Sequence, residues 1–188
     1  RSSDLSSVGK SSIIKRIKDG TFQTDILSTC NFEVNIIQRN YKKYNIIISL
    51  IFHDTPGVEQ FQNIIPKHYL SESQIILLVF SDINTLNELK HRWNKFYKKN
   101  INIENSIIIL IGNKSDTFGD NRDEIIKEGN KFADEIDAYF ITCSAKTGDN
   151  MENVDRYITT EAQRFIHNEE QKKELYKLSL WKNSKLNK

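Results

Sequence analysis

Four polar residues that follow an apolar run have the side chains needed to recognise a purine base. Asn113-Lys114-Ser115-Asp116 comes directly after the run 106–112. The two oxygens of an aspartate can accept from the N1–H and the exocyclic N2 amine of guanine, whereas adenine presents no such pair of donors. Asn113 can bond the base and tie neighbouring loops together, and the stem of Lys114 can cover a face of the ring. The tetrad is a candidate guanine reader, and the alternative is a polar turn that closes a buried strand.

Four further motifs surround this tetrad in a fixed order. They are Val8-Gly9-Lys10-Ser11-Ser12, then Thr29, then Asp54-Thr55-Pro56-Gly57 before the tetrad, and Ser144-Ala145-Lys146 after it. This order resembles the Ras superfamily of small GTPases, and the Rab branch in particular, over residues 5–166. Five motifs in one order are far more specific than any one of them alone. The resemblance implies GTP or GDP as ligand, Mg²⁺ as cofactor, and the fold of a P-loop small G-domain.

The resemblance assigns phosphate-binding roles to the first motif. In a P-loop, backbone N–H groups wrap the β-phosphate, the lysine reaches the β- and γ-phosphates, and the next hydroxyl takes a Mg²⁺ position. Lys10 and Ser11 match the last two roles. The alternative for Gly9-Lys10-Ser11 is an ordinary helix start.

The resemblance also predicts the metal and catalytic residues. Asp54 matches the acidic residue that holds Mg²⁺, and Thr29 matches the switch threonine that joins the metal when the γ-phosphate is present. The expected metal ligands are therefore Ser11, Thr29 and Asp54. The expected catalytic residues are Lys10 and Gly57, because the Gly57 N–H is matched to the group that senses the γ-phosphate.

Two further positions are expected to frame the base. Phe22 resembles the aromatic residue that packs against guanine, with a surface-loop phenylalanine as the alternative. The backbone N–H of Ala145 is matched to the guanine O6. The complete predicted nucleotide-binding set is Val8, Gly9, Lys10, Ser11, Ser12, Phe22, Thr29, Asp54, Gly57, Asn113, Lys114, Asp116, Ser144, Ala145 and Lys146.

The phosphate loop departs from the family pattern. A full P-loop is Gly-x-x-x-x-Gly-Lys-Ser/Thr, but Asp4 stands five residues before Gly9, and Ser7 stands where the family has another glycine. Asp4 brings a negative side chain towards a polyphosphate, and a non-glycine residue at φ > 0 adds strain of about 1 kcal/mol. The residues before Val8 also leave no room for the apolar strand that leads into the loop, so we expect the first strand to be absent.

A second departure concerns hydrolysis. Val58 stands where the family has the glutamine that orients the attacking water, and valine cannot orient water by hydrogen bonding. We therefore expect a switch with slow GTP hydrolysis. Two alternatives remain: a pseudo-GTPase that serves as a binding scaffold, and a domain-swapped or partner-completed assembly in which another chain fills the empty strand position.

Composition fits one compact α/β domain. The 188 residues include 27 basic and 25 acidic side chains, and a net charge of +2 is too balanced for a nucleic-acid binder. Cys30 and Cys143 are too few for a disulfide framework, which suits a reducing cytosolic setting. The apolar runs are too short to span a bilayer.

Alternating strand and helix patterns predict a doubly wound, mostly parallel sheet with helices on both faces. Short β-branched runs predict strands covered on both faces at 46–52, 75–80 and 107–111, with a last strand at 139–143. The segment 32–38 is expected to form an antiparallel edge strand paired with the first of these runs. Apolar stripes near a spacing of 3.6 predict helices after Lys10 and around residues 86–97, 125–136 and 154–166.

The composition changes after Ile166. We assign 1–166 to the G-domain and 167–188 to a basic extension of the last helix or a partly disordered tail. The tail holds apolar residues among its lysines, so the alternative to a solvated helix end is contact with an anionic membrane surface.

The resemblance implies a cytoplasmic protein, with the cytosolic face of an endomembrane as a peripheral site and vesicle trafficking as its role. It implies effector, exchange-factor and activating proteins as partners through the switch regions. No nucleic-acid partner is expected.

Overall fold

The computed structural model describes residues 8–23, 33–41, 45–55, 67–102 and 105–186 of the chain. The strands are β1 (Glu33–Tyr41), β2 (Ile46–Asp54), β3 (Ile75–Phe80), β4 (Ile107–Gly112) and β5 (Ala138–Thr142). The longer helices are α1 (Lys10–Asp19), α2 (Lys67–Glu72), α3 (Ile83–Arg92), α5 (Arg122–Glu135) and α6 (Met151–Leu186). The shorter helical pieces are η2 (Trp93–Tyr97), α4 (Lys98–Asn100), η3 (Ser115–Thr117) and η4 (Gly119–Asn121). The expected alternation of strands and helices is confirmed.

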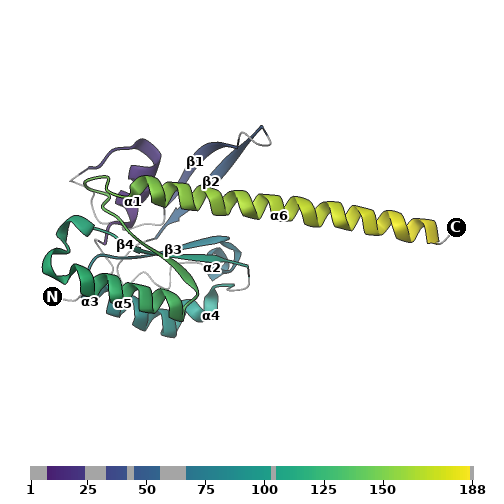
Figure 1. The fold of residues 1–188 in the computed structure, drawn as a ribbon. Helices are drawn as coiled ribbons and strands as arrows, with labels where there is room; N and C mark the ends of the chain where they lie inside the picture. The colour runs from purple at the N-terminus through teal and green to yellow at the C-terminus, as the bar shows by residue number, and fades with distance from the viewer. Residues whose placement is uncertain (1–7, 24–32, 42–44, 56–66, 103–104, 187–188) are drawn as a thin grey trace.

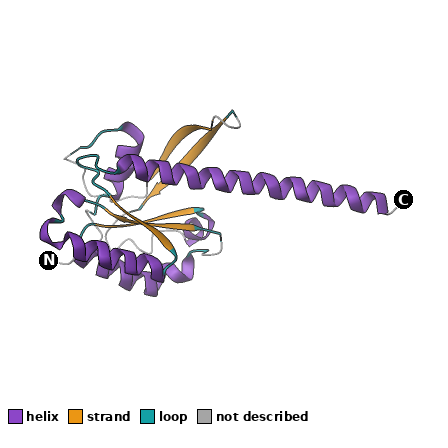
Figure 2. Cartoon of the chain, in the orientation of Figure 1, coloured by secondary structure: helices purple, strands orange, loops and turns teal. Residues whose placement is uncertain are grey.

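The strands form two groups within the described residues (Figure 2). β3, β4 and β5 pair in parallel in that order, and the register places Ile75 opposite Ile107 and Ile108 opposite Ala138. β1 and β2 form an antiparallel hairpin, as predicted. β2 shares no pairing with β3 in the described chain, so the sheet is divided between these two strands. Residues 1–7 lie outside the described part, so the absence of a first strand stays a prediction.

The expectation for β2 was wrong in one respect. Its apolar run predicted a strand covered on both faces, but burial alternates along it: Ile48, Leu50 and Phe52 are buried, while Ile47 and Ile51 are 62% and 57% exposed. The only strand that β2 pairs with in the described chain is β1, so one face of the hairpin stays uncovered by described residues. A continuous apolar run therefore did not distinguish a two-sided strand from a one-sided one.

Helices cover both faces of the three-stranded sheet, as predicted. Figure 1 shows α3 and α5 together on one side of the strands, and α1 and α6 on the other. The apolar stripes of α1 and α5 are buried, with Ile13 and Ile17 from α1 and Phe132 from α5 at 8% exposure or less. Gly129 lets α5 approach the sheet closely, because a Cβ there would lie 2.5 Å from the Phe140 ring. These layers hold the carboxyl ends of the parallel strands in fixed positions.

The last helix continues without a break past residue 166. α6 has 36 residues, and at 1.5 Å per residue it is about 54 Å long, so it projects well beyond the sheet (Figure 1). Of the two forms expected for 167–188, the helical extension is the one observed as far as Leu186. The assignment of 1–166 as a separate domain stays a prediction. No helix in the described ranges is both long and apolar enough to cross a membrane.

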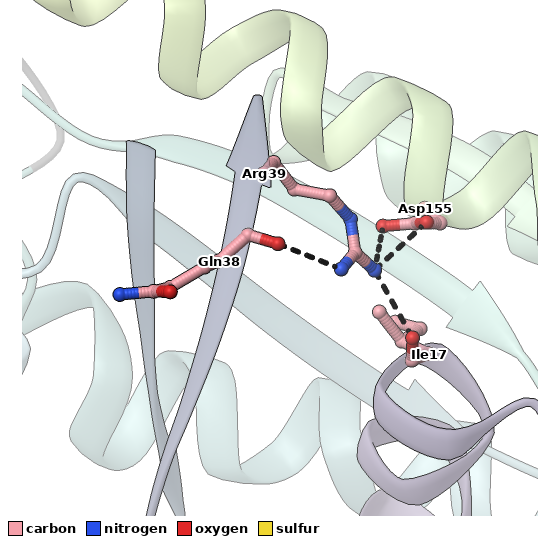
Figure 3. A network of polar contacts seen from close by, with 4 residues as sticks. All are labelled: Ile17, Gln38, Arg39 and Asp155. Atoms are coloured by element: carbon pink, nitrogen blue, oxygen red, sulfur yellow. Dashed lines mark hydrogen bonds and ion pairs between the residues drawn. The ribbon is translucent and has the colours of Figure 1, made fainter. Parts of the chain in front are cut away.

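Arg39, on β1 of the hairpin, forms hydrogen bonds to both α1 and α6 (Figure 3). Arg39 of β1 donates to the Ile17 carbonyl at the end of α1, at 3.0 Å, and to both carboxylate oxygens of Asp155 on α6, at 3.2 and 3.0 Å. A second guanidinium nitrogen donates to the Gln38 carbonyl at 3.2 Å. The side chains of Arg39 and Asp155 are about one-quarter to one-third exposed, so this pair fixes the orientation of the hairpin more than it adds stability.

Candidate nucleotide site

Four of the predicted motifs meet at one end of the sheet. Asn113 follows β4, and Ser144 and Ala145 follow β5. Gly9 precedes α1, and Asp54, at the end of β2, accepts a hydrogen bond from Ser11 of that helix. In a parallel sheet the carboxyl ends of neighbouring strands lie at the same edge, and the loops there form the binding crevice. The fold therefore gathers residues that are more than one hundred positions apart in the sequence.

Asn113 forms hydrogen bonds to three separate segments at this end of the sheet. Its side chain is 2% exposed; its Nδ2 donates to the Val8 carbonyl at 2.8 Å, and its Oδ1 accepts from the Ala145 N–H at 3.0 Å. Its backbone N–H donates to the Phe80 carbonyl at 2.8 Å. The expectation that Asn113 ties neighbouring loops together is confirmed, because one amide links the start of α1 to the loop after β5.

This arrangement changes the expectation for Ala145. Its N–H was predicted to donate to guanine O6, but here it donates to Asn113 Oδ1. A bound base would have to share this donor with Asn113 or take it over. Ala145 itself is 2% exposed, and its small side chain suits a loop packed this closely.

Position 9 requires a glycine both because of its backbone conformation and because of the Asn113 side chain beside it. Its φ is +93°, in the left-handed region that side chains rarely adopt, and a Cβ there would lie 2.3 Å from the Asn113 Nδ2. The loop can therefore pass Asn113 only with glycine at this position. Val8, one residue earlier, is buried in the core at 1% exposure.

Asp116 is positioned by the loop after β5. The Ser144 hydroxyl donates to Asp116 Oδ1 at 2.5 Å and accepts from the Thr147 N–H at 3.1 Å. Ser144 is fully buried, whereas Asp116 is exposed, so a buried hydroxyl holds one oxygen of an exposed carboxylate. Lys114, two residues before Asp116, has a φ of +63°, which turns the chain sharply out of β4. The carboxylate is thus fixed and accessible, as a base reader requires.

Asp54 has the character of a cation ligand. It is 2% exposed, and burial raises the pKa of its carboxyl, while a hydrogen bond from Ser11 and the charge of Lys10 act in the opposite direction. Within the described part of the chain its Oδ1 is buried and has no hydrogen-bond partner. A buried carboxylate oxygen without a donor, beside a serine hydroxyl, fits the oxygen ligands that Mg²⁺ prefers. Ser11 and Asp54 are therefore the residues in this structure that would hold the metal.

Some predicted residues are not brought into the described site. Thr29 and Gly57 lie outside the described residues, as do Asp4, Ser7 and Val58. Their assigned roles stay predictions. Phe22 is described and half-buried, and Ser12 is half-buried near the start of α1, but neither shows a contact that defines a base or phosphate position.

Two residues in the site have no counterpart among the site residues expected from the sequence. Arg16, in the last turn of α1, donates to the carbonyls of both Ala145 and Lys146. A basic residue at a helix end is so common that only knowledge of the tertiary contact could have singled it out. Asp149 was missed in the same way; its carboxylate accepts from the Ser115 hydroxyl at 3.2 Å.

Cys143 is a packing residue, and we expect it to be unreactive. It is fully buried, and burial raises the pKa of its thiol to about 12, with the nearby Asp149 charge acting in the same direction. At pH 8 only roughly one thiol in ten thousand would be ionised, because each unit between pH and pKa lowers the thiolate fraction tenfold.

Alkylation kinetics on a Cys30→Ser variant, which removes the other cysteine, would measure this. Iodoacetamide should modify Cys143 only as fast as the chain unfolds in urea. Rapid labelling of the folded protein at pH 8 would contradict the inferred burial of the thiol.

Comparison with known proteins agrees with the site. The model of the Ras family matches residues 5–164. The chain is 32% identical over 152 residues to the Ras-related protein RABE1d of Arabidopsis thaliana, covering 79% of this chain and 68% of that protein. It is 32% identical over 152 residues to the Ras-related protein RAB1BV of Beta vulgaris, again covering 79% and 68%.

The order of the motifs, the parallel sheet with helices on both faces, and the loops joined through Asn113 all agree with this match. The expected resemblance is confirmed at the level of the family and of its Rab-named members. The chain belongs to the Ras family and is a Rab-like small GTPase.

Proposed function

We propose that this chain is a guanine-nucleotide switch that binds GTP and GDP with Mg²⁺. The observation that carries the proposal is the side chain of Asn113, which joins Val8 at the phosphate loop to Ala145 at the base loop. One residue thereby couples the part of the site that would hold phosphate to the part that would hold guanine. Asp116, fixed by Ser144 and exposed, supplies the acceptor that selects guanine over adenine.

The phosphate end would be formed by the start of α1. Backbone N–H groups from Gly9 to Ser12 point out of a helix N-terminus, where an anion is favoured. Lys10 would pair with the β- and γ-phosphates, and Ser11 and Asp54 would hold Mg²⁺ beside them. The metal would neutralise charge on the phosphates. Thr29 and Gly57 would respond to the γ-phosphate and change the shape of the surface that partners bind.

Partners and location follow from this proposal. The switch would act through effector, exchange-factor and activating proteins that distinguish its two nucleotide states. We place it in the cytoplasm and at the cytosolic face of an endomembrane, with a role in vesicle trafficking. The Rab-named relatives support this role.

We expect GTP hydrolysis to be slow, and we expect one substitution to raise its rate. Val58 cannot orient water, so Val58→Gln should raise the single-turnover rate of GTP hydrolysis, by at least about tenfold if water positioning limits the reaction. The affinity for GDP should not change, because residue 58 is matched to the water and not to the base. Phosphate release from preloaded protein, followed for both variants with Mg²⁺, measures this. Equal rates would mean that Val58 is not the limiting residue.

Identification of the nucleotide that copurifies with the chain tests the proposed function. The purified protein is denatured and the released nucleotide is separated by chromatography. Close to one GDP or GTP per chain is expected. A protein that is folded, carries no nucleotide and binds neither GDP nor GTP with Mg²⁺ would overturn the switch in favour of the scaffold alternative.

A further inference from the structure

A single arginine connects the helix of the phosphate loop to the loop of the base. Arg16 lies in the last turn of α1, the helix that begins at Lys10. Its Nε donates to the Ala145 carbonyl at 2.8 Å, and one terminal nitrogen donates to the Lys146 carbonyl at 2.6 Å. Its other terminal nitrogen donates to the Gly20 carbonyl at 2.8 Å, beyond the end of its own helix. All three nitrogens of the guanidinium are therefore engaged, and two of them hold the base loop.

The loop is shaped to receive this side chain. Gly148 has a φ of +88°, and a Cβ at that position would lie 3.8 Å from the Arg16 Cζ, so the glycine passes directly beside the guanidinium. The Gly148 N–H donates to the Ser144 carbonyl at 2.8 Å, which closes the loop as a tight turn. The planar fork of arginine can bond two successive carbonyls at once, whereas the ammonium of lysine is a single point.

The loop that Arg16 holds is the one that orients both base-reading side chains. The Ala145 N–H bonds Asn113, and the Ser144 hydroxyl bonds Asp116. A shift of residues 144–146 would therefore move the amide and the carboxylate together. No described side chain other than Arg16 donates to the Ala145 or Lys146 carbonyl.

We propose that Arg16 is a positioning residue for guanine recognition, which locks the 144–146 loop onto α1 so that Asn113 and Asp116 are preorganised for the base. This inference rests on the proposed nucleotide-binding function. Arg16 itself would touch neither base nor phosphate. Its loss should weaken selection among purine bases, and not only the overall stability of the fold.

Two nucleotides that differ only in the 2-amino group of the base distinguish a loss of base selection from a loss of overall stability. Inosine diphosphate lacks the 2-amino group of GDP and so cannot make the second hydrogen bond to Asp116. In the wild-type chain, GDP should bind about tenfold or more tighter than inosine diphosphate, since a hydrogen bond to a charged group is worth about 1.5–3 kcal/mol. Arg16→Ala should speed GDP dissociation by about tenfold and reduce this discrimination at least about threefold. Arg16→Lys, which keeps the positive charge on a single donating nitrogen, should discriminate between the two nucleotides less than the wild type and more than Arg16→Ala.

Arg39→Ala is the matched control. Arg39 also makes several hydrogen bonds and also holds the end of α1, through the Ile17 carbonyl, but among the described residues it makes no hydrogen bond to the base loop (Figure 3). Both alanine variants should lower the urea midpoint of unfolding. Only the Arg16 variants should lower the ratio of the two dissociation constants.

The outcomes are distinct. An unchanged ratio in Arg16→Ala, or an equal fall in Arg39→Ala, would overturn the positioning role while leaving nucleotide binding intact. If Arg16→Ala does not fold, Arg16→Lys is judged by the same ratio, and a wild-type value would overturn the role. A wild-type chain that binds neither GDP nor inosine diphosphate would instead overturn the proposed function, and this inference with it.

Discussion

Gly9→Ala should abolish nucleotide binding and destabilise the fold. The added Cβ would lie 2.3 Å from the Asn113 Nδ2, and the backbone would remain at φ +93°. The left-handed conformation costs a non-glycine residue about 1–2 kcal/mol, and overpacking a buried position adds about 1–3 kcal/mol. Because Asn113 is itself buried, it can yield only by giving up its bond to the Val8 carbonyl. We therefore expect a loss of about 2–5 kcal/mol in the free energy of unfolding by urea, with no measurable binding of GDP.

Gly20→Ala is the control for this prediction. Gly20 ends the same helix at φ +69°, but a Cβ there meets nothing within 4 Å. It carries the backbone penalty without the clash, so it should lose only about 1–2 kcal/mol and keep its affinity for GDP. If the two variants behave alike, the contact between Gly9 and Asn113 does not shape the site.

Asn113→Ala should have the second largest effect. The change leaves the Val8 carbonyl and the Ala145 N–H without their partner, and both lie in the buried region around residue 113. A buried polar group left unsatisfied costs about 1–3 kcal/mol, so we expect a loss of about 2–5 kcal/mol in unfolding free energy. GDP affinity should fall by at least about a hundredfold, because the phosphate loop and the base loop would no longer be joined. Calorimetric titration and urea unfolding of the same preparation measure both quantities.

Two comparisons make the Asn113 result specific. Asn113→Asp keeps an acceptor for the Ala145 N–H but sets a carboxylate oxygen against the Val8 carbonyl, so it should fail nearly as badly. Asn130→Ala removes an exposed amide on α5 that donates only to the Ile126 carbonyl, and it should change unfolding by no more than about 0.5 kcal/mol. An Asn113→Ala chain that still binds GDP like the wild type would show that the two loops are positioned by other contacts.

The secondary structure could be predicted wherever local sequence decides it. Continuous β-branched runs predicted β3 and β4 nearly to the residue. The burial of a strand face could not be predicted, because it depends on neighbouring elements. The exposed face of β2, marked by Ile47 and Ile51, depends on which elements lie beside that strand. No local pattern records that dependence.

The candidate site was predictable to a similar extent. Residues with distinctive chemistry, such as Asn113 and Asp116, could be singled out as candidates from their types and spacing, because few side chains can perform those tasks. Arg16 was missed because a basic residue in a last helical turn is ordinary, and its bonds to residues 145 and 146 span about 130 positions of sequence. The acceptor of the Ala145 N–H, which is Asn113 Oδ1, could also be seen only in three dimensions.

We infer that the loop from Asn113 to Asp116 makes this chain specific for guanine nucleotides. This specificity is tested most directly by calorimetric titration of the wild-type chain and of Asp116→Ala with GDP and with ADP, in the presence of Mg²⁺. The wild-type chain should bind GDP at least about a hundredfold tighter than ADP, since two hydrogen bonds to a charged acceptor are available only to guanine. Asp116→Ala should lose most of that preference. Equal affinity of the wild-type chain for GDP and ADP, or an Asp116→Ala variant with an unchanged preference, would contradict it.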